Sequence, residues 1–216
     1  MKWFSETNDP PKPFNLPDHY FSYNNTNFAV LAAIIEKVSQ KSYGDFLQEE
    51  IFRPLGMKNS RVARGLSDST ANRTFGYQQG KRIAFDHFDN VLGDKGVIST
   101  TGDLLKWYQA LRGEKIVNKE LLREAYTPRS FEYPGLRNYG YGFRLWLNEK
   151  QQTDYIYHTG WWKGYNTIMF FDLREDFVII LLSNRYNKDV YHIKDVIDIM
   201  HGNAKNTSVE ENILDE

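Results

Sequence analysis

The sequence predicts an α/β protein of the α+β type, in which an antiparallel β-sheet is flanked by helices. Two observations indicate this class. Apolar residues recur at helical spacing within residues 26–126, and short β-rich runs separated by turn residues fill residues 139–201. With 216 residues, 41% of them hydrophobic, the chain can bury one core. We therefore expect a single domain over residues 1–201 and a mobile acidic tail over residues 202–216.

The first expected helix covers residues 26–39. Phe28, Leu31 and Ile35 recur there at helical spacing, and Thr26 or Asn25 can cap its start. Three further helices are expected. One opens at Ser42 and stops at Pro54 and Gly56, and the other two lie at residues 99–113 and 118–126, each with a capping residue at its start and Gly or Pro at its end.

The sheet is expected to be an antiparallel meander of about four strands. The four runs that predict it are "YGFRLWL", "DYIYHTG", "YNTIMFFDL" and "FVIILLSN". A small hairpin turning near Gly80 precedes them, and an amphipathic helix over residues 188–202 should follow them.

Composition excludes several function classes. The 27 basic residues balance 28 acidic ones, so nucleic acid is not an expected partner. The absence of cysteine excludes disulfides and a thiolate nucleophile. No apolar run approaches the ~20 residues that span a bilayer, and the Pro-rich start at residues 1–17 has no signal-peptide core.

The common site motifs are also missing, so we expect no metal and no cofactor. The histidines lack metal-ligand spacing, "GYQQGK" lacks the length of a phosphate loop, and "GLSDS" around Ser67 lacks the second glycine of a nucleophile elbow. The histidines are His19, His87, His158, His192 and His201.

Three stretches remain, in this order: "YNN" at 23–25, "GDKGVISTTGDLLKW" at 93–107 and "YHTGWWKGYNT" at 157–167. With them the chain, from about Pro10 to His201, resembles the penicillin-recognising serine hydrolases. The similar branch holds class C β-lactamases, esterases, D-aminopeptidases and penicillin-binding proteins. That family combines S-x-x-K, Y-x-N, and K-T-G or H-T-G on an edge strand. Tyr23 and Asn25 match the second element, and His158, Thr159 and Gly160 match the third.

The first element is missing, because no serine in the chain has a lysine three residues later. In the family this element lies upstream of Y-x-N. The resemblance therefore implies a β-lactamase/transpeptidase-like fold that is incomplete at its N-terminus, and a C-terminal portion that is inactive alone. It also implies a periplasmic or secreted location for a full-length protein.

The resemblance implies that Tyr23, Asn25 and His158 are catalytic residues of acyl transfer and that Thr159, Gly160 and Trp161 bind the substrate. Tyr23 would shuttle a proton between the absent serine and the leaving group, and Asn25 would hold the substrate amide or the absent lysine. Thr159 would donate to a substrate carboxylate or carbonyl, Gly160 would let the substrate backbone approach, and the main-chain N–H of Trp161 would donate to the oxyanion.

Position 158 bears on the substrate. A lysine there would be a lasting cation beside a substrate carboxylate, whereas His158, with a reference pKa of ~6.5, is largely neutral at pH 7. The expected partner is a small-molecule or peptide substrate with a carbonyl centre, and the histidine favours an ester, an amide or a D-peptide over a β-lactam.

Structural explanations exist for each of these residues taken alone. Asn25 can be a helix cap and Tyr23 a buried ring, His158 can be an ordinary strand-end histidine, and Trp161 and Trp162 can be core or interface aromatics.

Two function classes remain open: a serine acyl hydrolase, and a non-catalytic binding module that keeps the fold. Because N-terminal strands of the family pair beside the C-terminal ones, "FVIILLSN" should have an open edge, through which the chain can form a homo-oligomer.

Overall fold

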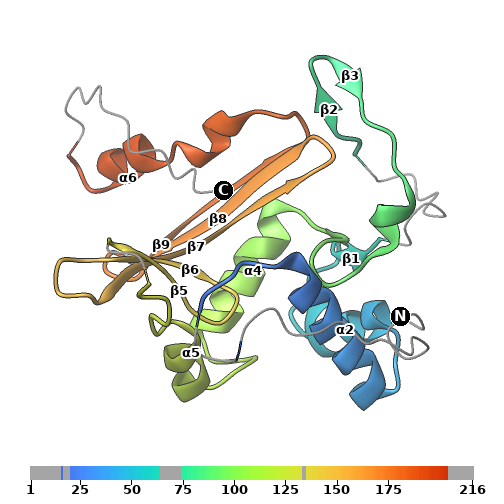
Figure 1. The fold of residues 1–216 in the computed structure, drawn as a ribbon, viewed down its shortest axis with the longest axis horizontal. Helices are drawn as coiled ribbons and strands as arrows, with labels where there is room; N and C mark the ends of the chain where they lie inside the picture. Colours follow the sequence, from blue (N-terminus) through green and yellow to red (C-terminus); the bar gives the residue numbers. More distant parts are fainter. Residues whose placement is uncertain (1–15, 17–19, 64–73, 133–134, 204–216) are drawn as a thin grey trace.

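The computed structural model of the chain describes residues 16, 20–63, 74–132 and 135–203. Its centre is a five-stranded antiparallel sheet with the order β5-β6-β7-β8-β9, so each strand pairs with its neighbour in sequence (Figure 1). The predicted antiparallel meander is therefore confirmed, with one strand more than expected. The strands are β5 (Arg137–Tyr139), β6 (Arg144–Leu147), β7 (Thr153–Trp162), β8 (Tyr165–Asp172) and β9 (Phe177–Ser183).

A tight hairpin joins the two longest strands of the sheet. Trp162 pairs with Tyr165, and the two residues between them, Lys163 and Gly164, have φ of 47° and 85°. Two positive φ values in a two-residue loop match the twist of antiparallel strands, which makes this turn a rigid one. The end of β7, which carries the H-T-G sequence, is therefore held on a regular hairpin.

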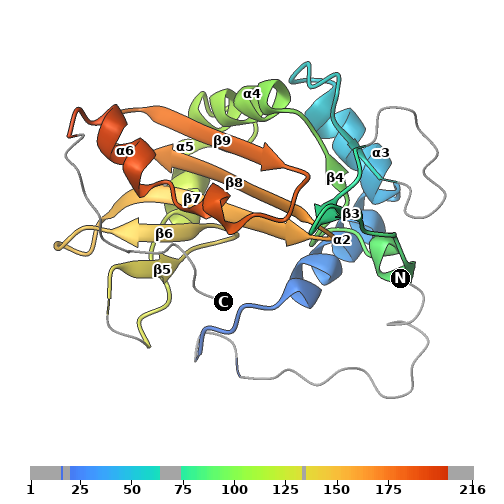
Figure 2. The ribbon, with the colours of Figure 1, turned by 90° about the horizontal axis from the view of Figure 1, so that it is seen from above.

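Helices cover both faces of this sheet (Figure 2). On one face, α4 (Thr101–Arg112) and α5 (Lys119–Ala125) pack on Leu145, Ile156 and Phe171. On the other face lie the short 3₁₀ helix η4 (Lys188–Tyr191) and α6 (Lys194–Met200). Because side chains alternate along a strand, a β8 buried on both faces reads as a nearly continuous apolar run.

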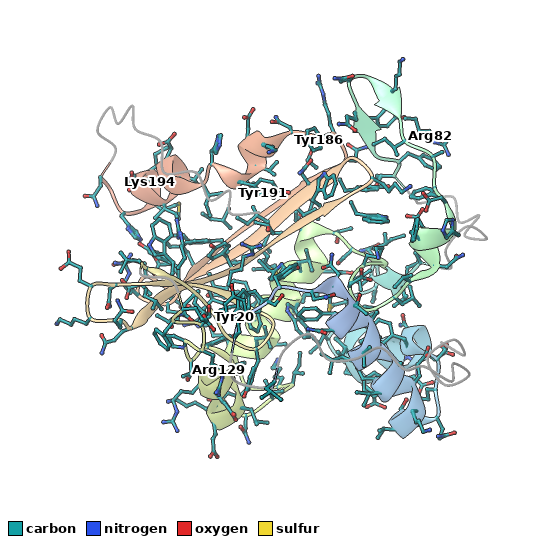
Figure 3. The ribbon with its side chains drawn as sticks, in the orientation of Figure 1. Tyr20, Arg82, Arg129, Tyr186, Tyr191 and Lys194 are labelled. Carbon is teal, nitrogen blue, oxygen red and sulfur yellow. The ribbon has the colours of Figure 1, made fainter. Side chains whose placement is uncertain are left out.

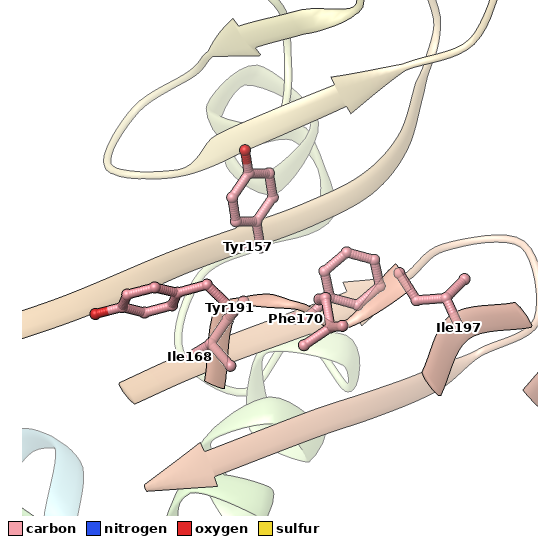
Figure 4. Packing of buried hydrophobic residues seen from close by; sticks show 6 residues of the cluster. Tyr157, Ile168, Phe170, Tyr191 and Ile197 are labelled. Atoms are coloured by element: carbon pink, nitrogen blue, oxygen red, sulfur yellow. The ribbon is translucent and has the colours of Figure 1, made fainter. Parts of the chain in front are cut away.

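The face covered by η4 and α6 has a compact core. Tyr157, Ile168 and Phe170 from the sheet pack against Tyr191 and Ile197 from the C-terminal helices (Figure 4). Burial of such side chains contributes about 1.5–3 kcal/mol each. The C-terminal helices therefore hold the back of β7 and β8.

The C-terminal segment is not the single helix expected over residues 188–202. It is η4 followed by α6, with a break at His192 and Ile193. Ile193 has no exposed surface and belongs to the same core as Tyr191. The break places both side chains in the core, which an uninterrupted helix would not do at a spacing of two residues.

A group of helices stands at one end of the sheet, formed by α2 (Asn25–Ser39), α3 (Tyr43–Leu47) and a π-helical turn, η1 (Gln48–Phe52). The helix expected to run from Ser42 to a stop at Pro54 and Gly56 is therefore only five residues of α-helix. Ser42 caps it, accepting a hydrogen bond from the Asp45 N–H as predicted. Pro54 lacks an N–H for the α-helical pattern, and the chain widens before it, with Arg53 N–H donating to the Gln48 carbonyl.

Short elements link the helices to the sheet. β1 (Arg61–Val62) pairs with β4 (Val97–Ile98), and β2 (Tyr77–Gln78) pairs with β3 (Lys81–Arg82), which confirms the hairpin near Gly80. The 3₁₀ helix η3 (His87–Asn90) follows β3. The expected N-terminal loop, His19, the "GLSDS" segment and nearly all of the acidic tail lie outside the described residues.

Candidate functional site

The Y-N-N segment lies directly before α2. Asn24, not Asn25 or Thr26, is the N-cap, because its side-chain oxygen accepts a hydrogen bond from the Thr26 N–H at 2.8 Å. The expected cap was therefore wrong by one residue. Asn25 is the first helical residue and is exposed, so capping does not account for its side chain.

The chain before this helix extends toward β5 and β6 (Figures 1 and 2). The Phe21 N–H donates to Glu132 Oε1 at 2.7 Å, and the Phe21 ring packs on Tyr139 with ring centres 5.0 Å apart. These two contacts hold the segment over β5. They carry Tyr23 from the helical end of the molecule to the sheet.

Tyr23 meets three side chains there, one from each of β5, β6 and β7. Its ring centre is 5.9 Å from that of Tyr139 and 6.1 Å from that of His158, and the Arg144 guanidinium carbon lies 5.5 Å from it. The side chain is 43% exposed, so Tyr23 is not the buried ring of the structural alternative. The two sequence elements Y-x-N and H-T-G therefore come together in space.

His158 is held through both ring nitrogens. Nδ1 lies 2.7 Å from the Thr159 carbonyl oxygen, which can only accept, so Nδ1–H is the donor. In the neutral ring, Nε2 then carries no proton and accepts a hydrogen bond from the Tyr139 hydroxyl at 3.1 Å. Burial lowers the pKa of His158, the bond to Thr159 opposes that shift and the Arg144 charge adds to it. The ring is therefore neutral at pH 7, as expected from its reference value.

The H-T-G sequence occupies the second half of β7. Pairing of β7 with β6 ends at Tyr157, opposite Arg144, whereas pairing with β8 continues to Trp162. Among the described strands, the first half of β7 thus has a partner on both sides, whereas residues 158–162 have β8 on one side and an open edge on the other. A ligand with an extended backbone can pair with such an edge.

Gly160 is constrained from behind as well. A Cβ added there would lie 2.3 Å from Thr167 Oγ1 on the neighbouring strand β8. Its carbonyl accepts a hydrogen bond from the Tyr191 hydroxyl at 2.8 Å, and the same hydroxyl accepts from Asn166 Nδ2 at 2.7 Å. The glycine therefore has a packing reason in addition to the one expected from substrate approach. Figure 3 shows Tyr191 between the C-terminal helices and the sheet.

The two tryptophans after Gly160 differ in their surroundings. Trp161 is 65% exposed and is therefore not a core residue. Trp162 donates from Nε1 to Asp89 Oδ1 at 2.7 Å, and the next residue, Lys163, forms an ion pair with Asp86 at 2.5 Å. The η3 segment thus fixes the end of β7 through Trp162 and leaves the side chain of Trp161 accessible.

The loop at residues 93–96 lies between helix α2 and the end of strand β7. A Cβ on Gly93 would be 2.4 Å from the Phe28 carbonyl oxygen, which places Gly93 against α2. Lys95 Nζ lies 4.5 Å from the Trp162 ring centre and 2.5 Å from Asp94 Oδ2. This loop therefore connects the start of α2 with the end of β7, although its sequence alone indicates no role.

No metal site or membrane span is found in the part of the chain that the structure describes. Within it, no three His, Asp or Glu side chains are grouped so that they could hold a metal ion. No helix among the described residues is long and apolar enough to cross a membrane.

The sequence profile of the Beta-lactamase family matches residues 7–202. The chain belongs to this family. It is 30% identical over 192 residues to penicillin-binding protein 4* of Bacillus subtilis, an alignment that covers 81% of the chain and 42% of that protein. It is 29% identical over 133 residues to the D-aminopeptidase of Brucella anthropi, covering 60% of the chain and 25% of that protein.

A solved structure has the same fold. The octameric penicillin-binding protein homologue from Pyrococcus abyssi superposes with a TM-score of 0.71 at 26% identity, covering 86% of the chain and 44% of that protein. The chain thus spans less than half the length of each of these three proteins. Its fold is that of the β-lactamase and transpeptidase proteins, as expected.

Proposed function

We propose that this chain supplies the substrate-strand and proton-transfer side of a serine acyl hydrolase of the β-lactamase family. The observation that supports this most is the contact of Tyr23 with His158, whose ring centres lie 6.1 Å apart although Y-x-N and H-T-G are distant in sequence. Acyl transfer needs a proton carrier beside the strand that binds the substrate. The nucleophile would come from an S-x-x-K segment, which the chain does not contain.

Each residue has a part in the proposed reaction. An S-x-x-K serine attacks the carbonyl carbon, the bond from that carbon to the leaving group breaks, and the serine proton passes through Tyr23 to the leaving group. Water then attacks the acyl-enzyme, releases the acid and returns a proton to the serine, so the bonds and protons balance. Asn25, at the start of α2, holds the substrate amide or the lysine. Thr159 donates to the substrate, Gly160 admits its backbone to the edge of β7, and the Trp161 N–H donates to the oxyanion.

The neutral state of His158 bears on the substrate class. A β-lactam or a D-Ala-D-Ala peptide carries a carboxylate, and the ring of His158 brings no positive charge to it at pH 7. We therefore infer that the hydrolase prefers an ester, an amide or a D-amino acid derivative. The family relative named a D-aminopeptidase supports this choice.

The first prediction concerns acylation. The chain as it stands should remain unlabelled by a fluorophosphonate or a fluorescent penicillin, because it has no S-x-x-K serine to form the acyl-enzyme. The DNA upstream of the Met1 codon is read for an in-frame S-x-x-K, and the longer chain that it encodes should be labelled at that serine. Mass spectrometry of both chains measures the label.

Three results would contradict this proposal. The first is stoichiometric labelling of the present chain at any serine, because the mechanism would then use another nucleophile. The second is a longer chain that takes no label, and the third is an upstream stop codon with a ribosome site. The second and third outcomes would support the alternative, a non-catalytic binding module that keeps the fold.

A second prediction concerns self-association. Strand β9 ends the sheet and has β8 as its one partner among the described strands. An apolar edge strand tends to pair with another chain. We expect the chain to form dimers or larger assemblies in a concentration-dependent way, and light scattering after size exclusion measures this. The family relative from Pyrococcus abyssi, named as octameric, agrees with association in general.

Two substitutions distinguish the surfaces that could be responsible. Leu182→Lys places a charge on β9, where Leu182 is 41% exposed, and should weaken association. Ile34→Lys changes an apolar side chain on α2 that is 51% exposed, and it should not weaken association. A chain that stays monomeric at high concentration, or one that Ile34→Lys alone makes monomeric, would rule out the β9 edge.

A further inference from the structure

The positive charge beside Tyr23 does not come from the sequence elements S-x-x-K, Y-x-N or H-T-G. A tyrosine that takes up and releases a proton needs a positive charge near its hydroxyl, because its reference pKa of ~10 lies far above neutral pH. The matching element offers position 158, where a lysine would serve, but this chain has histidine. Both nitrogens of that ring are engaged, by Tyr139 and by the Thr159 carbonyl.

Arg144 places a cation beside the Tyr23 ring. It is the first residue of β6, where the register sets it between Tyr139 of β5 and Tyr157 of β7. Its guanidinium carbon is 5.5 Å from the centre of the Tyr23 ring. Arginine keeps its charge at any pH at which the protein is folded, and it lies against aromatic rings more favourably than lysine does.

We propose that Arg144 is the cation that acts on the Tyr23 hydroxyl in this site, in place of the residue at position 158. The positive charge is thus on strand β6, and not on the neighbouring substrate strand β7, where a lysine at position 158 would place it. A charge on β6 stabilises the Tyr23 phenolate, and His158, locked by Tyr139, serves as a neutral part of the wall. This inference deepens the proposed hydrolase function and rests on it for its chemical meaning.

The groups around Tyr23 act on its pKa in opposite directions, and the pKa of Tyr23 lies above its ordinary value. Burial raises the pKa of Tyr23, the Arg144 charge lowers it, and the Asp94 carboxylate raises it further. Arg144 is thus the group that lowers the pKa of Tyr23, against the effects of burial and of Asp94. The remaining groups that face Tyr23, the Tyr139 hydroxyl and the neutral His158 ring, carry no charge near pH 7.

Titration of Tyr23 in the present chain tests this proposal without any need for hydrolysis. The chain is prepared with tyrosine carrying ¹³C at the ζ carbon, and the Tyr23 signal is assigned from Tyr23→Phe. Arg144→Gln should raise the pKa of Tyr23, because the stabilising charge is lost. Arg144→Lys should keep most of the wild-type value, which a role of Arg144 in packing alone would not produce.

Arg137 provides the matched control. It is a sheet arginine whose guanidinium carbon lies 3.6 Å from the Trp146 ring centre, and Arg137→Gln should leave the Tyr23 pKa unchanged. An unchanged Tyr23 pKa in Arg144→Gln, or an equal rise in Arg137→Gln, would overturn the proposal. Thermal unfolding of each variant shows whether the fold is kept. If Arg144→Gln does not fold, Arg144→Met, which removes the charge and keeps a long side chain, carries the test and should raise the Tyr23 pKa in the same way.

The longer, S-x-x-K-containing chain gives a second readout. There, Arg144→Gln should move the Tyr23-dependent limb of the kcat/KM pH profile toward higher pH, and Arg144→Lys should restore it. A limb that does not move while the hydrolase is active would contradict the role of Arg144 in the reaction. Absence of any hydrolysis would instead overturn the proposed function, and the titration would still decide whether Arg144 acts on Tyr23.

Discussion

Replacing Tyr23 with phenylalanine in an S-x-x-K-containing version of this chain is expected, from the proposed function, to lower kcat about 10²–10⁴-fold, the range typical of a general acid or base. Phenylalanine keeps the ring, which packs between Tyr139 and His158, and removes only the hydroxyl that carries the proton. KM should change little, since the proposed substrate contacts come from the edge of β7. Steady-state kinetics on an ester or a D-amino acid amide measures both constants.

Tyr108→Phe is a suitable control for this substitution. The Tyr108 hydroxyl donates to Asp176 Oδ1 at 3.0 Å, in the turn between β8 and β9, away from the H-T-G end of β7. Its loss removes a hydroxyl from a tyrosine of the same chain without touching the site. A Tyr23→Phe enzyme with the kcat of the Tyr108→Phe enzyme would show that Tyr23 transfers no proton in the rate-limiting step.

The fold class was predictable because its signals are local. Periodic apolar residues with caps identify helices, and runs such as "YNTIMFFDL" bounded by turns identify buried strands. β5 was missed because three residues are too few for an alternating pattern. The break before Ile193 was missed because tertiary packing sets it. The π-helical turn after α3 was missed because Pro54 predicts the end of a helix but not the wider turn before it. A one-residue error in a cap is common where several Asn and Thr residues adjoin.

The candidate site was only half predictable. Tyr23, Asn25 and the H-T-G residues lie in motifs whose spacing identifies them. Tyr139 and Arg144 lie in the run "NYGYGFRLWL", which reads as a strand and carries no motif. Their contacts with His158 and Tyr23 depend on which strands are neighbours, and the periodicity of one strand does not contain that information.

The second large effect is on stability, at the junction of α4 with the turn before β1. The Asp103 side chain is buried, and its Oδ2 accepts from the Asn59 N–H at 2.7 Å and the Ser60 hydroxyl at 2.9 Å. Its Oδ1 accepts from Lys106 Nζ at 2.7 Å. Asp103→Ala would remove a charged acceptor of the Asn59 N–H and of the buried Ser60 hydroxyl, whose other partner is the Ser99 hydroxyl at 2.8 Å. Hydrogen bonds to a charged group contribute about 1.5–3 kcal/mol each. We expect the free energy of unfolding to fall by about 3 kcal/mol, measured by urea unfolding at pH 7.

Asp45→Ala is the surface counterpart, because Asp45 is also a first-turn carboxylate that accepts a hydrogen bond, from the Ser42 hydroxyl at 2.6 Å. It should cost less than about 1 kcal/mol, since water can replace its partner. A similar loss in both variants would show that helix capping, and not the buried contact with Asn59 and Ser60, explains the Asp103 effect.

The contribution of Asp103 to the free energy of unfolding should decrease as the pH falls. Burial raises the pKa of Asp103, but the hydrogen bonds from Lys106, Asn59 and Ser60 outweigh it, and the pKa in the folded protein lies below the usual value. The stabilisation is therefore present above the unfolded value of about 3.9 and is lost as the pH falls through the folded pKa. The difference in unfolding free energy between wild type and Asp103→Asn should be constant from pH 7 to about 5 and should shrink below about pH 4. A difference that stays constant or grows on acidification would show that the charge of Asp103 does not contribute to the stability of this junction.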